Sequence, residues 1–192
     1  MSRSKTGGRR FLRVLLVLLI AVAIAELLLF LFADDLFRLY YRKDFVPYVE
    51  QSAAEFGVPE ELVYAVILRE SGFRPDAVSS AGAKGLMQMR DVSFEEMRGR
   101  MGLTGEGDIF DPEQNIRCGT YCLSYLYRYF GNWETALAAY NAGIGNVQDW
   151  LRDSRYSADG KTLTDVPFPQ TAAYIRNVTR AQRAYAALYG GK

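Results

Sequence analysis

Apolar residues are distributed along this 192-residue chain in two different ways. Residues 14–33 form an almost continuous apolar run in which the only charge is Glu26. A helix of this length spans ~30 Å, which matches the hydrocarbon core of a bilayer. Its leucine, isoleucine, valine and phenylalanine side chains contribute roughly −5 to −9 kcal/mol to insertion, against about +3 kcal/mol for the charge. The run therefore predicts one transmembrane helix.

The flanking charges predict how this helix is oriented. Residues 1–13 form a basic tail, which the positive-inside rule places in the cytoplasm, so residues 34–192 lie on the other side of a membrane that the chain crosses once. The alternative is a cleaved signal peptide, because Ala23-Ile24-Ala25 resembles a cleavage site. Six more apolar residues, 27–32, follow that site and favour an uncleaved signal anchor. The cations of the tail are Arg3, Lys5, Arg9, Arg10 and Arg13.

From residue 34 onwards, helix signals are dense and no strand-like alternation persists. We expect a juxtamembrane segment over residues 34–46 and one all-α globular domain of about six or seven helices over residues 47–192. One helix should end at Gly57 and the next should open at Pro59. The later helices have expected N-terminal caps at Ser93, Asp111, Asn132 and Asn146, and the last runs from about Pro169 to Leu188.

Charge and composition narrow the chemistry that this domain can perform. The chain has 23 basic and 22 acidic residues, of which five basic residues and one acidic residue precede residue 34. Residues 34–192 therefore carry 18 basic and 21 acidic residues, and this slightly acidic balance gives no sign of nucleic-acid binding. The chain has no histidine, so acid–base chemistry must rest on other side chains. Cys118 and Cys122 lie four residues apart in a predicted helix, too far for a disulfide, and they are interpreted as small buried residues. We expect no metal and no cofactor.

One carboxylate occupies a position where the pattern calls for an apolar residue. Val63, Val66 and Ile67 form a helical stripe, and Glu70 is its next member, in the last turn before Gly72. Burial and the negative end of the helix dipole both disfavour the ionised form, so the pKa should rise. An acid that is still protonated near neutral pH can donate a proton to a leaving oxygen. On this pattern alone, an acid that pairs with a nearby arginine or faces solvent is an equally good interpretation.

Two further polar stretches are candidates for a binding site. Residues 79–85 are mostly small, which allows close approach of a ligand, and Gln88 follows them with an amide suited to a neutral sugar or peptide. The alternative there is a flexible surface loop. Tyr140 and Asn141 end an alanine- and leucine-rich helix. A tyrosine at such a place is often a core residue, whereas an asparagine is harder to bury without a partner.

Taken together, residues 70–88, 115–147 and 167–178 resemble the catalytic domain of SLT-type lytic transglycosylases, glycoside hydrolase family 23. The resemblance extends over about residues 47–187. It implies a lysozyme-like fold of the goose type and peptidoglycan glycan strands as substrate. It also implies cleavage of the β-1,4 bond between N-acetylmuramic acid (MurNAc) and N-acetylglucosamine (GlcNAc), with formation of 1,6-anhydromuramoyl ends.

The same resemblance assigns roles to individual residues. It makes Glu70 the single catalytic acid and base, and it makes five residues substrate-binding: Ser71, Gln88, Tyr140, Asn141 and Tyr174. Two other functions stay open, a lysozyme-type hydrolase of the same bond and a non-catalytic peptidoglycan-binding scaffold. The sequence identifies no protein partner. The chain departs from the family pattern at Met89-Arg90-Asp91, Cys122 and Gln170.

Overall fold

The computed structural model describes residues 5–190, and it separates into two compact units, residues 1–42 and 43–192. The first unit consists of helix α1 (Lys5–Tyr40). Its segment Gly8–Tyr40 is long and apolar enough to cross a membrane, with a mean hydropathy of 3.1 over its most apolar window. Residues 1–4 of the expected basic tail, including Arg3, lie outside the described part.

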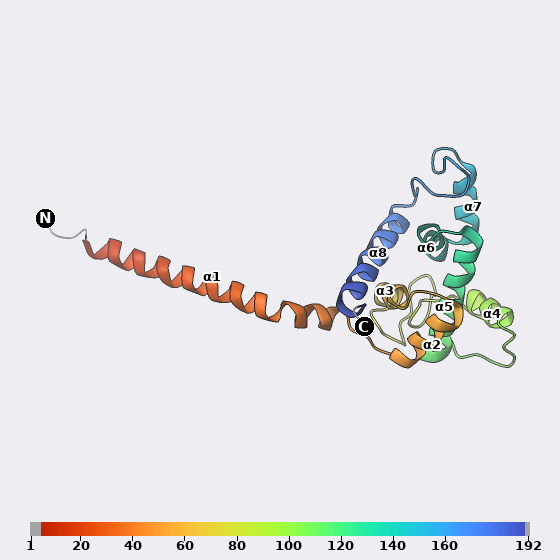
Figure 1. Cartoon of the computed structure of the whole chain (residues 1–192), viewed down its shortest axis with the longest axis horizontal. Coiled ribbons are helices and arrows are strands. Elements are labelled where there is room, and N and C mark those ends of the chain that lie inside the picture. Colours follow the sequence, from red (N-terminus) through yellow and green to blue (C-terminus); the bar gives the residue numbers. More distant parts are fainter. Residues whose placement is uncertain (1–4, 191–192) are drawn as a thin grey trace. The chain divides into compact units, whose positions relative to one another are not determined.

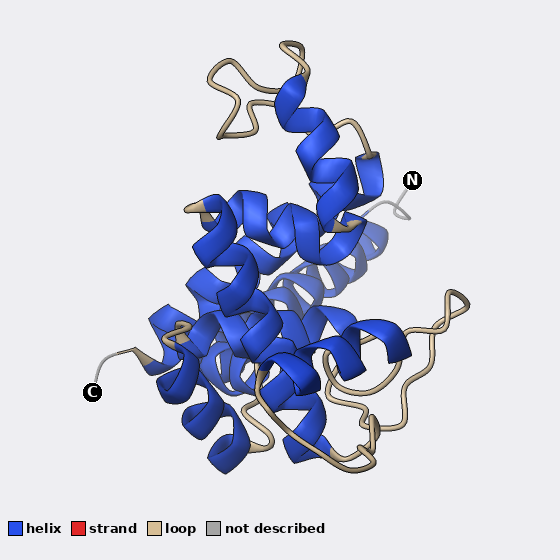
Figure 2. Cartoon of the chain, turned by 90° about the vertical axis from the view of Figure 1, so that its right-hand side faces the viewer, coloured by secondary structure: helices blue, strands red, loops and turns tan. Residues whose placement is uncertain are grey.

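The second unit is built from helices alone, as expected (Figures 1 and 2). Within the described residues it has no strand, and only two isolated β-bridges occur, between positions 78 and 84 and between 84 and 89. Its helices are α2 (Val46–Phe56), α3 (Glu60–Glu70), α4 (Asp91–Arg100), α5 (Pro112–Phe130), α6 (Trp133–Ala142), α7 (Ile144–Arg152) and α8 (Pro169–Tyr189).

Two of the expected helix caps are present. The Asp111 carboxylate accepts a hydrogen bond from a backbone N–H in the first turn of α5, with proline at the first helical position. The Asn132 side chain does the same for α6 by accepting from the backbone N–H of Thr135. Gly57 ends α2 in the left-handed conformation that glycine adopts readily.

The other two expected caps are wrong. Helix α4 begins at Asp91, two residues before Ser93, because an acid in the first turn suits the helix dipole and Lys84 pairs with it at 2.8 Å. Helix α7 begins at Ile144, so Asn146 lies inside it, and its side-chain amide donates to the carbonyl of Ala142.

Helix α3 is the centre of the globular unit. Residues 62–67 are all buried, so the helix is enclosed on every side, whereas its sequence pattern predicted a single buried stripe. Helix α3 packs against α8 and α2, and α6 packs against α5, α7 and α8 (Figure 1). Glu70 is therefore the last residue of a helix that runs through the core. The two cysteines of α5 are both free thiols, as expected.

Candidate active site

A groove of about 550 Å³ opens at the C-terminal end of α3. We call it the catalytic groove. Its walls come from the end of α3, the loop between α3 and α4, helices α4 and α5, and the junction of α6 with α7. Four of the six predicted site residues line it together although they are far apart in sequence: Glu70, Gln88, Tyr140 and Asn141.

Glu70 has the ionisation behaviour that proton donation requires. Burial raises the pKa of its carboxyl from 4.5 to about 7, while Tyr174 and the charge of Arg69 act in the opposite direction and limit the rise. The cause that the sequence pattern suggested, burial on the core-facing side of a helix, is therefore the dominant one. A carboxyl with this pKa is present as both acid and base near neutral pH, so it can give up a proton and take one back.

Tyr174 reaches the same carboxyl from α8. Burial raises the pKa of its phenol well above the usual value, so the hydroxyl stays protonated beside Glu70. Among the described residues this buried hydroxyl has no partner in full hydrogen-bonding geometry. It is positioned to donate to the carboxyl once Glu70 has ionised, which would stabilise the base form.

Two predicted site residues, Tyr174 and Ser71, are not part of the groove lining. Ser71 follows the last residue of α3. Its side chain is buried, and its hydroxyl donates to the carbonyl of Ile67 at 3.2 Å. The same carbonyl also accepts from the backbone N–H of Ser71, so the serine hydroxyl adds a second bond to the last turn of α3. This is a structural role, and a contact of Ser71 with substrate stays a prediction.

Gln88 lies on the groove with an unusual backbone. It adopts a left-handed conformation, with φ of 49°, which side-chain-bearing residues seldom adopt. Its amide nitrogen donates to the carbonyls of Ala77 and Gly85, at 3.1 and 3.0 Å. These bonds hold the side chain and its loop together and leave the amide oxygen for a ligand. Strained backbone that is held in this way is typical of functional sites.

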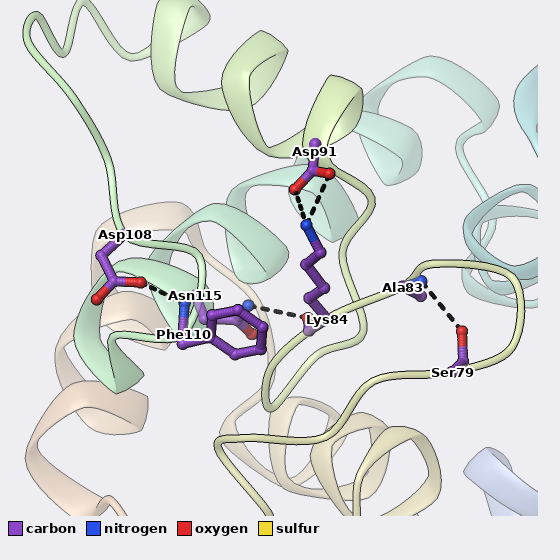
Figure 3. Close-up of polar contacts among 7 residues, drawn as sticks. All are labelled: Ser79, Ala83, Lys84, Asp91, Asp108, Phe110 and Asn115. Carbon is purple, nitrogen blue, oxygen red and sulfur yellow. Dashed lines mark hydrogen bonds and ion pairs between the residues drawn. The ribbon is translucent and has the colours of Figure 1, made fainter.

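The loop that carries Gln88 is ordered by a residue that sequence reasoning missed. Asn115, in the first turns of α5, is completely buried. Its side-chain oxygen accepts from the backbone N–H of Met87 at 2.7 Å, and its nitrogen donates to the carbonyls of Ile109 and Lys84. Figure 3 shows the bond to Lys84. An asparagine on the buried face of a long helix was the available signal.

Close approach to Asn115 also explains one of the glycines in this loop. Gly85 has φ of 76°, and a Cβ atom built on it would lie 2.2 Å from the Asn115 side-chain nitrogen. Farther along the loop, the Ser79 hydroxyl accepts from the backbone N–H of Ala83, and Lys84 pairs with Asp91 (Figure 3). These contacts hold the loop against the groove, which favours the binding-site interpretation over a flexible surface loop.

Tyr140 and Asn141 connect the end of α6 to the Gln88 loop and to α8. The Tyr140 hydroxyl donates to the carbonyl of Met87 at 2.7 Å, so the end of α6 is tied to the Gln88 loop. The Asn141 side-chain oxygen accepts from the hydroxyl of Thr171, a buried residue of α8, at 2.8 Å. That bond fixes which way the amide faces and leaves its NH₂ group for a ligand at the exposed groove wall. Thr171 is a second residue that sequence reasoning missed.

A second carboxylate, Glu96, also lines the groove. It differs from Glu70 because its side chain is half exposed and pairs with Arg100 at 2.9 Å. Of the two acids on the groove, Glu70 is thus the one whose environment favours the protonated form. The fold and this site together define an all-helical, lysozyme-like domain with one partly buried acid, of raised pKa, on an open groove.

The chain belongs to the Transglycosylase SLT domain family, which matches residues 47–163. It is 35% identical over 140 residues to the soluble lytic murein transglycosylase of Escherichia coli K12, which covers 70% of this chain and 22% of that protein. It is 34% identical over 167 residues to the membrane-bound lytic murein transglycosylase C of Yersinia pestis (strain Pestoides F), which covers 73% of this chain and 46% of that protein. The chain thus spans less than half the length of either relative.

Solved structures give the same family. An inactive glutamate-to-glutamine mutant of the lytic transglycosylase Slt from Pseudomonas aeruginosa matches with a TM-score of 0.68 and 30% identity, over 77% of this chain and 24% of that one. The 70-kDa soluble lytic transglycosylase in complex with bulgecin A matches with a TM-score of 0.71 and 28% identity, over 81% of this chain and 26% of that one. The expected fold class is confirmed.

Proposed function

We propose that this protein is a membrane-anchored lytic transglycosylase that cleaves the MurNAc-β-1,4-GlcNAc bond of peptidoglycan and leaves 1,6-anhydromuramoyl ends. The observation that carries the proposal is the partly buried Glu70 carboxyl, with a pKa of about 7, on a groove large enough for sugar rings. The two relatives named above support this proposed activity, because both are described as lytic murein transglycosylases.

The first step is proton donation. Glu70 in its acid form protonates the glycosidic oxygen, and the bond from that oxygen to the anomeric carbon of MurNAc breaks. Positive charge develops on the sugar ring, and the substrate's own N-acetyl carbonyl stabilises it. This takes the place of the second carboxylate that most glycosidases supply. Glu96 is poorly suited to that role because Arg100 already holds its carboxylate.

The second step returns the proton. Glu70 is now a carboxylate, and it accepts the proton of the MurNAc C6 hydroxyl as that oxygen attacks the anomeric carbon. A 1,6-anhydro ring forms, Glu70 is again protonated, and no water is consumed. The Tyr174 hydroxyl stabilises the carboxylate between the two steps by donating to it. Gln88 and Asn141 bind the sugar through the amide groups that their loop and helix contacts orient.

The proposed arrangement in the membrane follows from the N-terminal unit. Helix α1 is apolar over a membrane-spanning length, and one relative is described as membrane-bound. Residues 1–13 lie in the cytoplasm, residues 14–33 form the anchor, and the catalytic domain of residues 47–192 faces the wall polymer. Protease treatment of intact spheroplasts tests this arrangement, since it should remove the catalytic domain. Protection of that domain until lysis would contradict it.

The activity is tested by digesting purified peptidoglycan with the full chain in mild detergent and analysing the products by mass spectrometry. Each new muramoyl end should be lighter than a reducing end by the mass of one water. Glu70→Gln should produce no new ends, whereas the matched control Glu96→Gln should retain cleavage. Reducing ends alone would show a lysozyme-type hydrolase. Binding of the polymer with no cleavage would show a scaffold.

A further inference from the structure

A second cavity of about 550 Å³ lies on the outer face of α8. We call it the α8 groove. It is bounded by α8, by loop residues 163–166 and by Glu134 in the first turn of α6, and it shares no lining residue with the catalytic groove. Figure 1 shows the long loop between α7 and α8 that supplies one of its walls. Nothing in the proposed reaction uses this cavity.

The charges of α8 are arranged in an unusual way. The helix contains three arginines and no acidic residue, and all three of them, Arg176, Arg180 and Arg183, line the α8 groove. Like charges at this spacing disfavour a helix unless something compensates for them. Val178 and Ala181 are buried on the other face, so the arginines occupy the side turned away from the core.

These guanidinium groups have no ion-pair or hydrogen-bond partner within residues 8–190. Some arginines elsewhere in the unit do have such partners: Arg117 pairs with Glu55 at 2.7 Å and Arg155 pairs with Asp153. A guanidinium offers a planar fork of donors that matches a carboxylate or a phosphate. The three guanidinium groups of the α8 groove can therefore bind several anionic groups of a ligand at once.

The remaining lining residues discriminate between kinds of anion. Glu134 and Asp165 also face the cavity, and two carboxylates would repel a polyphosphate or a lipid phosphate. They suit a ligand that carries amino groups in addition to its carboxylates. Leu163, Val166 and Ile175 add apolar surface for short alkyl groups. The combination matches an acidic peptide better than a simple polyanion.

We propose that the α8 groove binds the acidic peptide that branches from the glycan strands of peptidoglycan. This rests on the proposed function, which makes those strands the substrate. The peptide carries several carboxylates, the free amino group of its diamino acid and alanine methyl groups, and each has a counterpart in the groove. Binding it outside the catalytic groove would retain the enzyme on peptide-bearing strands.

The test is a calorimetric titration of the full chain in mild detergent with the tripeptide L-alanyl-γ-D-glutamyl-meso-diaminopimelate. Saturable binding is expected for the wild type and for Glu70→Gln. The triple variant Arg176→Gln, Arg180→Gln, Arg183→Gln should bind roughly tenfold or more weakly, through loss of charge-assisted hydrogen bonds. A tripeptide with amidated carboxylates should bind the wild type more weakly by a similar factor.

A matched control removes the same charge elsewhere: Arg117→Gln, Arg152→Gln and Arg155→Gln together replace three arginines that pair with nearby acids. This control should bind the tripeptide like the wild type, and circular dichroism should show both triple variants folded. Equal binding by the wild type and the α8 triple variant would overturn the proposal. So would the absence of saturable binding, or a preference of the α8 arginines for inorganic polyphosphate or anionic vesicles.

Failure of this proposal can be told apart from failure of the proposed function. Tripeptide binding without cleavage of any strand would contradict the transglycosylase assignment and support the α8 groove as a peptide site. Cleavage without tripeptide binding would contradict the α8 groove alone.

Discussion

Replacement of Glu70 by glutamine should make the folded domain more stable near neutral and alkaline pH. Glutamine has nearly the same shape as a protonated glutamate and cannot ionise. In the wild type, burial raises the Glu70 pKa from 4.5 to about 7, so the folded state disfavours the carboxylate. The unfolded chain does not disfavour it, and this difference lowers the free energy of unfolding once the pH exceeds 4.5.

The size of the effect follows from the two pKa values. The interval between 4.5 and about 7 corresponds to ~3 kcal/mol. Below 4.5 both states are protonated at this position, so wild type and Glu70→Gln should be equally stable. Between pH 4.5 and about 7 the free energy of unfolding of the wild type falls relative to that of the variant. Above about pH 7 the variant should be more stable by ~3 kcal/mol, which corresponds to about 6–12 °C in Tm for a domain of this size.

Tryptophan fluorescence during thermal unfolding is a suitable assay. Both tryptophans of the chain, Trp133 and Trp150, lie in the globular unit, so the signal does not report on the transmembrane helix. Melting curves at about pH 4 and about pH 8 should coincide at the lower value and separate at the higher one. Glu96→Gln is the control, and its exposed, ion-paired side chain should give little change at either pH. No gain at alkaline pH for Glu70→Gln, or the same gain at both values, would refute the reasoning.

Three further outcomes are expected. The kcat/KM for glycan cleavage should fall as the pH rises through about 7, because the Glu70 acid form is lost; a profile that is flat to about pH 9 would contradict this. Tyr140→Phe leaves the Met87 carbonyl without its donor, so urea unfolding should show a loss of roughly 1–3 kcal/mol together with lower activity, and an unchanged midpoint would exclude that role. Gly85→Ala should cost roughly 2 kcal/mol or more, measured in the same way, because the new methyl group would collide with Asn115 in a left-handed backbone; a variant as stable as wild type would show that the loop can move away.

The sequence was sufficient for the elements whose signals are local. Asp111 and Asn132 cap helices because a short side-chain acceptor precedes an apolar helical segment, and both could be predicted. Ser93 and Asn146 carry the same local signal and fail. For α4, the pairing of Lys84 with Asp91 favours a start two residues before the expected cap. Helix α7 begins at Ile144, and the Asn146 amide donates to the Ala142 carbonyl from within the helix.

The residues of the site also differ in whether a local sequence signal or a long-range contact reveals them. Periodicity alone placed Glu70 on the core-facing side of its helix and left its function open, and the structure adds the groove on which its partly buried carboxyl lies. Asn115 and Thr171 could not be assigned, because the bonds that tie them to the site, to Met87 and to Asn141, join residues 28 and 30 positions apart and sequence spacing does not show which groups meet. Ser71 matches the family motif, yet its position assigns it first to the helix end.

The central claim is that Glu70 acts through the substrate's own hydroxyl, with no water in the reaction. Digestion of purified peptidoglycan in heavy-oxygen-labelled water tests this most directly. The account predicts that the wild type forms anhydromuramoyl ends that carry no label, and that Glu70→Gln forms no new ends. Labelled reducing ends from the wild type, or undiminished cleavage by Glu70→Gln, would contradict it.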